Sequence, residues 1–119
     1  MSNHASMLRV TDEDGIVEIR IMTDAIVDET SIQHLDRGLK DLIDGREAPK
    51  LIVDFGNVRH LSSSALGTLI SVNSAVQDRG GELRLAAISG AILEVFRITK
   101  LDRIFVIDET TEDARIGLR

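Results

Sequence analysis

The segment from Leu61 to Ile70, LSSSALGTLI, places three serines between a strand-like run and an amphipathic helix. The preceding run, Leu51–Phe55, is apolar except for Asp54 and is typical of a buried strand. Hydroxyl side chains at a helix start accept hydrogen bonds from the first unpaired backbone N–H groups. The same N–H groups and the positive end of the helix dipole also suit a phosphate. Capping needs only one serine, so the segment predicts either a simple cap or a cap beside a covalently attached or bound anion.

Strand-like and helix-like segments alternate along the rest of the chain. Strands are expected at Leu8–Thr11, Ile16–Met22, Lys50–Phe55, Glu82–Ala87 and Ile104–Ile107. Helices are expected at Ser31–Asp44, Ser64–Arg79, Gly90–Ile98 and Thr110–Ile116. This order predicts a small α/β domain with a mixed, mostly parallel sheet of about five strands and about four helices.

Several residues give local turn and capping signals. Asp12–Gly15 suits a hairpin turn, and Thr30 with Gln33 suits a capping box at the start of the first helix. Gly45 is expected in the left-handed position after that helix, and Ser89 is expected to cap the third helix. The aromatic side chains are expected in the core: Phe55, Phe96 and Phe105.

Composition limits the classes of function. A chain of 119 residues with 43% hydrophobic side chains can bury one core, predicting a single domain over residues 8–119 after a mobile tail, Met1–Met7. That tail is polar and predicts no signal peptide, and no apolar run is long enough to span a membrane. The absence of cysteine excludes disulfides and thiolate metal sites and fits a reducing cytoplasm. The net charge of −6 argues against nucleic acid and leaves protein partners open.

Longer stretches resemble a known family. Lys50–Gly67 reads KLIVDFGNVRHLSSSALG, Val27-Asp28 precedes a helix-like segment, and Gly80-Gly81 precedes a strand-like one. Together these stretches, and the ending from Ile88 to Phe105, resemble the STAS domain of bacterial anti-sigma-factor antagonists. The resemblance runs from about Val10 to the C-terminus and implies the STAS fold.

The resemblance also implies a set of functional residues. Ser63 stands at the position that the family phosphorylates, and Ser64 is the second choice. Ser62 stands where the family has Asp, and Ala65 stands where it has Gly. The implied function is a protein-binding switch: the unmodified protein binds an anti-sigma-factor serine kinase, phosphorylation ends the interaction, and a phosphatase reverses it.

The same resemblance implies a docking surface. Asp28, His60 and the three serines, Ser62, Ser63 and Ser64, are the expected partner-binding residues. Because the carboxyl ends of strands gather at one edge of an open α/β sheet, Thr23–Thr30 and Arg59–Ala65 are expected to be contiguous. Asp28 could instead only cap a helix. Two other functions stay open: a STAS scaffold that is never phosphorylated, and a sensor that holds an anion or nucleotide at the helix start.

Catalytic interpretations lack the residues they need. Asp54, His60 and the serines could form a Ser-His-Asp set, but the G-x-S-x-G turn that exposes such a serine is absent. Asp54 is expected instead at a strand end, bonding loop amides, and His60 in a loop. His34 and Asp36 lie two residues apart on a helix and would face different directions, which is poor for a metal. The sequence therefore predicts no catalytic residues, no metal and no cofactor.

Overall fold

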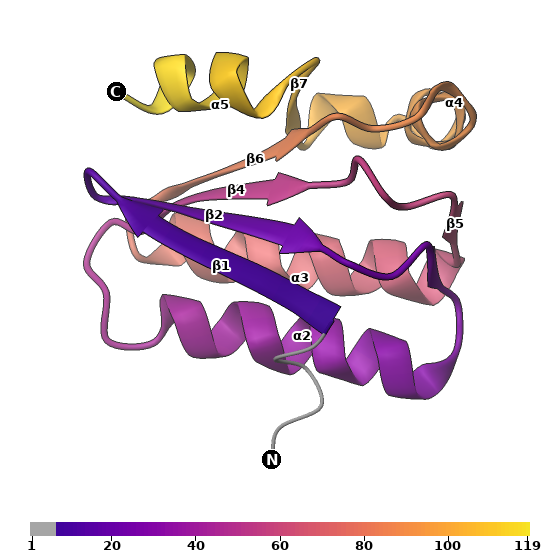
Figure 1. The fold of residues 1–119 in the computed structure, drawn as a ribbon, viewed down its shortest axis with the longest axis horizontal. Coiled ribbons are helices and arrows are strands. Elements are labelled where there is room, and N and C mark those ends of the chain that lie inside the picture. Colours follow the sequence, from indigo (N-terminus) through magenta and orange to yellow (C-terminus); the bar gives the residue numbers. More distant parts are fainter. Residues whose placement is uncertain (1–6) are drawn as a thin grey trace.

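The computed structural model describes residues 7–119 and contains a five-stranded sheet with helices on both faces (Figure 1). The strand order is β1-β2-β4-β6-β7, in which β1 is antiparallel to β2 and the other neighbours are parallel. These strands are β1 (Leu8–Glu13), β2 (Ile16–Ile21), β4 (Lys50–Asp54), β6 (Glu82–Ala86) and β7 (Val106–Asp108). The α-helices within the described residues are α2 (Glu29–Ile43), α3 (Ser63–Asp78), α4 (Gly90–Ile98) and α5 (Thr111–Leu118). The predicted mixed, mostly parallel sheet with four helices is confirmed.

Side-chain alternation along the strands divides the core between the two sheet faces. One face packs against α2, α3 and α4, and its buried residues include Ile19, Val53 and Leu85. The other face packs against α5 through a smaller cluster: Ile16, Ile52, Ala86, Ala114 and Leu118. Strand β4 lies between two parallel neighbours, and its residues after Lys50 are all buried. This explains its almost uninterrupted apolar sequence.

The first two strands form the predicted hairpin with a shorter turn than expected. Strand β1 continues to Glu13, which leaves Asp14 and Gly15 as the two loop residues. Both have positive φ, 56° for Asp14 and 77° for Gly15. Two positive φ values in a two-residue loop follow the right-handed twist of the strands, and Asp-Gly is a preferred pair for that turn.

Helix α2 begins earlier than predicted, and the predicted capping box of Thr30 and Gln33 is wrong. The N-cap is Asp28, whose Oδ2 accepts a hydrogen bond from the backbone N–H of Ser31 at 3.4 Å. Asp is a better N-cap than Thr, and Asp28 has the extended backbone of an N-cap residue. Gly45 has a φ of 77°, which confirms the predicted left-handed position after the helix.

The C-terminal strand also differs from its predicted range of Ile104–Ile107. A 3-10 helix, η1 (Leu101–Arg103), follows α4, and β7 starts only at Val106. The chain turns inward before the strand to bury Phe105, whose ring meets Phe96 edge-on with centroids 5.8 Å apart. Phe55 is buried as well, so all three phenylalanines belong to the core as predicted.

Two further predictions concern the cap at Ser89 and the N-terminal tail. Ser89 precedes α4 as expected but makes no side-chain capping bond, and its Oγ is buried with no hydrogen-bond partner among residues 7–119. The predicted tail, Met1–Met7, lies outside the described residues except for Met7. Met7 is buried in the core, and its carbonyl accepts a hydrogen bond from the Met22 N–H at 2.7 Å.

Candidate functional site

Two short strands, unpredicted from the sequence, join the loops before α2 and α3. Strand β3 (Ala25–Ile26) pairs in parallel with β5 (His60–Leu61). The Asp24 carbonyl accepts from the Arg59 and His60 N–H groups at 2.7 and 3.0 Å, and the Ile26 carbonyl accepts from the Ser62 N–H at 3.1 Å. These bonds place Thr23–Thr30 beside Arg59–Ala65 at the edge where the parallel strands end (Figure 1). The predicted partner-binding residues therefore share one region, although their role in binding stays a prediction.

The three serines occupy three different positions at the start of α3. Ser62 is the N-cap, and its Oγ accepts a hydrogen bond from the Ala65 N–H at 3.1 Å. Ser63 and Ser64 are the first two helical residues, and both are exposed. Ala65 is fully buried and packs in the main core. Ser62 does the capping, so α3 does not need Ser63 as its cap, and Ser63 is exposed.

Asp28 is exposed at the start of α2 and caps that helix. A hydrogen bond from the Ser31 side chain, the largest contribution, lowers the pKa of the Asp28 carboxyl below its ordinary value. Ionised Asp28 therefore contributes stability above its unfolded-state pKa, and this contribution is lost as the pH falls through the folded-state value. Capping does not prevent docking, because the side chain also faces solvent.

An exposed apolar side chain in this region was missed by sequence reasoning. Val27 lies between the buried Ile26 and the cap Asp28, and half of its surface is exposed. The available signal was the pair Ile26-Val27, because neighbouring side chains in a strand point in opposite directions. Val27 adds an exposed apolar contact point to a surface whose other exposed side chains include hydroxyl and charged groups.

Asp54 does not face the serines as a catalytic acid would. Its carboxylate is buried, Oδ1 accepts from the Gly56 N–H at 2.8 Å, and Oδ2 pairs with Arg20 Nε at 3.1 Å. This confirms the predicted strand-end role of Asp54, to which the structure adds Arg20 as a partner. His60 belongs to β5 and is exposed, in place of the expected loop position. The Ser-His-Asp arrangement therefore lacks its acid.

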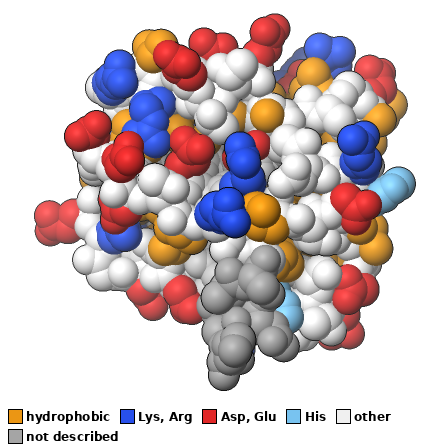
Figure 2. Space-filling view, in the orientation of Figure 1, with side chains coloured by type: hydrophobic (Ala, Val, Ile, Leu, Met, Phe, Trp, Pro, Cys, Tyr) orange, Lys and Arg blue, Asp and Glu red, His pale blue; other side chains and the backbone are white. Residues whose placement is uncertain are grey.

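The described part of the chain gives little support to a metal site, a nucleic-acid-binding surface or a membrane-spanning helix. Residues 7–119 contain no group of three or more His, Asp or Glu side chains placed to hold a metal ion. Acidic and basic side chains are interspersed over the face in Figure 2, so this face carries no extended basic stripe for nucleic acid. No helix among these residues combines the length and apolar character needed to cross a membrane.

Comparison with known families agrees with this architecture. A sequence model described as the STAS domain matches residues 7–114. The chain belongs to the STAS domain family. The match includes both paired loops and the serine segment at the start of α3, so the residues discussed above lie within the family's domain.

Solved structures of other STAS proteins share the fold. A putative anti-sigma factor antagonist from Thermotoga maritima is 22% identical with a TM-score of 0.82, over 98% of this chain and 97% of that one. The Bacillus cell fate determinant SpoIIAA in its phosphorylated form is 19% identical with a TM-score of 0.71, over 94% and 99%. A sulfate transporter family protein from Wolinella succinogenes is 14% identical with a TM-score of 0.68, over 87% and 84%. At these identities the likeness shows the fold, and function rests on the site.

Proposed function

We propose that this STAS protein is an anti-sigma-factor antagonist, a non-catalytic switch that binds an anti-sigma-factor serine kinase in the cytoplasm. The observation that carries the proposal is Ser63, an exposed hydroxyl on the first residue of α3, beside the paired loops. Structural neighbours named as anti-sigma factor antagonists support the same role. In this mechanism the kinase releases a sigma factor when it binds the unmodified protein.

Phosphorylation of Ser63 would end the interaction through charge. The kinase transfers a phosphoryl group from ATP to Ser63 Oγ, which adds about −1.5 to −2 charges in the middle of the docking surface. In the free protein the start of α3 can accommodate this charge, because its first N–H groups and the helix dipole favour an anion. The partner then meets a new charge at the interface, so the switch needs no refolding. A phosphatase restores the binding form.

Phosphopeptide mapping tests the assignment of the acceptor. After incubation with a kinase-type anti-sigma factor and ATP, phosphate is expected on Ser63. The Ser62 hydroxyl already accepts the capping bond from Ala65, which makes it the poorest acceptor of the three. Ser63→Ala should abolish labelling, while Ser74→Ala, at an exposed position later in the same helix, should leave it unchanged. Phosphate found on Ser62 or Ser64 alone would contradict the assignment.

Variants of Asp28 test whether the docking surface includes the start of α2. Asp28→Asn is expected to leave the melting temperature unchanged and to weaken partner binding at least about tenfold, because Asn keeps the cap and removes the charge. Asp28→Ala is the matched control: it removes the cap, which costs about 1 kcal/mol of helix stability. Calorimetric titration and thermal melting measure both effects. If Asp28→Asn binds normally while Asp28→Ala lowers the melting temperature, Asp28 is only a cap.

A second candidate is a STAS scaffold that is never phosphorylated. Two observations favour it: the cap at Ser62 is neutral where the family has an acidic residue, and Ala65 is locked in the core where the family has Gly. A stable partner complex with no labelling of any serine would support the scaffold. The anion- or nucleotide-sensing alternative would instead appear as a rise in melting temperature on addition of the ligand.

A further inference from the structure

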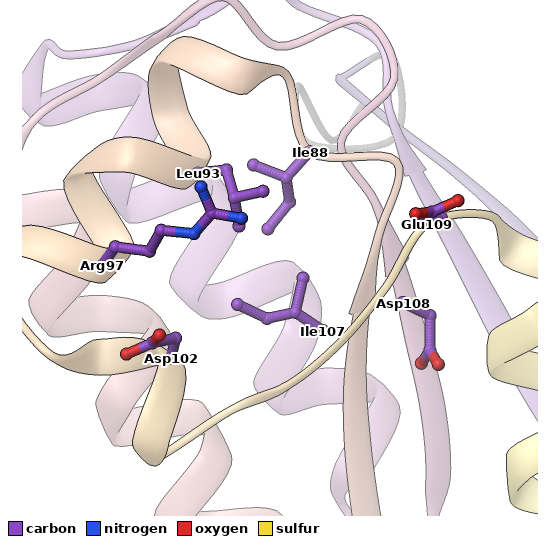
Figure 3. Close-up of a pocket in the computed structure, with 7 residues that line it drawn as sticks. All are labelled: Ile88, Leu93, Arg97, Asp102, Ile107, Asp108 and Glu109. Atoms are coloured by element: carbon purple, nitrogen blue, oxygen red, sulfur yellow. The ribbon is translucent and has the colours of Figure 1, made fainter.

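A cavity of about 430 Å³ lies between α4, η1 and the end of β7, and the function proposed above does not use it (Figure 3). Its lining combines three apolar side chains with charged residues of both signs: Ile88, Leu93, Arg97, Asp102, Ile107, Asp108 and Glu109. Figure 3 shows Ile88, Leu93 and Ile107 gathered around the centre of the cavity. A cavity of this size with an apolar lining and a few polar groups is typical of a small-molecule site.

The charged residues that line the cavity differ in the ion pairs that they already form. Asp108 pairs with Arg84 at 3.4 Å, and in Figure 3 its carboxylate points away from the apolar centre. Arg97 meets only Glu94, at 3.9 Å on an exposed helix surface, an ion pair that contributes little. Asp102 forms no ion pair with any residue of the described chain, 7–119. Arg97, whose one ion pair is long and exposed, and Asp102, which has none, are therefore a cation and an anion of the lining that a ligand could engage.

Arg97 and Asp102 also stand on the same side of the cavity. In Figure 3 both project from the α4–η1 segment, with Asp102 below Arg97 and the apolar side chains beside them. They do not form an ion pair with each other within the described structure. A ligand with an anionic and a cationic group close together could contact both residues and extend an apolar portion toward Ile107.

We propose that this cavity binds a zwitterionic amino acid with an apolar side chain. The Arg97 guanidinium contacts the ligand carboxylate, and Asp102 accepts hydrogen bonds from the ligand ammonium. Ile88, Leu93 and Ile107 contact the ligand side chain, and Glu109 closes the opposite side. A ligand with one charge would engage only Arg97 or only Asp102, so the site should prefer a zwitterion, which engages both. This site is separate from Ser63 and its binding requires no kinase.

Titration of the isotope-labelled protein, followed by amide chemical shifts, tests the proposal with L-leucine and L-phenylalanine as probes. Saturable shifts are expected at Ile88, Leu93 and Ile107. Two analogues each lack one charge: 4-methylpentanoate has no ammonium, and 3-methylbutylamine has no carboxylate. Each should bind about tenfold more weakly than L-leucine, because one charge-assisted hydrogen-bonding group is lost. Glycine, without an apolar side chain, should give no saturable shift.

Two variants assign the charged contacts. Arg97→Gln should bind L-leucine no better than 3-methylbutylamine, and Asp102→Asn should bind it no better than 4-methylpentanoate. Both residues are exposed, so the variants should fold normally. Arg37→Gln and Asp41→Asn change exposed charges on α2 and serve as controls that should not alter binding. An absence of saturable shifts with both amino acids, or equal binding of L-leucine and its one-charge analogues, would overturn the proposal.

Discussion

Replacing Ser63 with Asp is expected to weaken binding of the kinase-type anti-sigma factor about a hundredfold, equivalent to about 2.8 kcal/mol. The new carboxylate would stand at the exposed first position of α3, within the surface formed by the paired loops. The fold should be unaffected, because an acidic residue in the first turn interacts favourably with the helix dipole. Ser63→Ala should bind like the parent and resist switching by ATP.

A matched control on α3 tests whether the position of the new charge, and not the added charge alone, weakens binding. Ser74 is exposed and lies eleven residues after Ser63 on α3, on nearly the same helix face but about 16 Å further along. Ser74→Asp adds the same charge outside the proposed surface and should leave affinity unchanged. Calorimetric titration of the three variants and the parent measures the effect. Equal affinities for Ser63→Asp and the parent would rule out charge repulsion at this surface.

Gly81→Ala is expected to produce the largest loss of stability, about 3 kcal/mol. A Cβ at Gly81 would clash with the Pro49 carbonyl oxygen and would lie 2.7 Å from the Pro49 nitrogen. These are backbone atoms next to β4, and the same carbonyl accepts a hydrogen bond from the Glu82 N–H at 2.9 Å. Relief of the clash therefore has to separate the starts of β4 and β6. Overpacking of this kind typically costs about 1–3 kcal/mol, and an immovable backbone places the cost at the upper end.

Thermal melting measures this loss, with a fall of more than about 10 °C expected for a domain of this size. Gly67→Ala is the matched control, because Gly67 is exposed in α3 and a Cβ there would meet nothing within 4 Å. Ala is favoured over Gly by about 1 kcal/mol in a helix, so this variant should be more stable than the parent. A Gly81→Ala protein as stable as the parent would show that β4 and β6 can separate at little cost.

Most secondary structure could be predicted because it depends on local patterns. The apolar run of Leu51–Phe55 identified the central strand, and the periodic apolar residues identified α2 and α3 within one or two residues of their ends. The serine segment after Leu61 was correctly placed at a helix start, since capping depends on a few neighbouring residues. The choice among three neighbouring serines was not local. Ser62, which is the cap, also donates its N–H to the carbonyl of Ile26, 36 residues earlier in the chain.

The fold class, the family resemblance and the candidate serines could be inferred from the sequence, because periodicity, caps and short motifs are properties of neighbouring residues. Which distant segments meet could be seen only in the folded domain. Strands β3 and β5 are two residues each, too short for any periodic pattern, and exist only because the two loops lie side by side. The Arg20–Asp54 pair and the cavity between α4 and β7 likewise depend on packing between separate elements. Such contacts are set by the arrangement of the whole sheet and its helices, which no local pattern records.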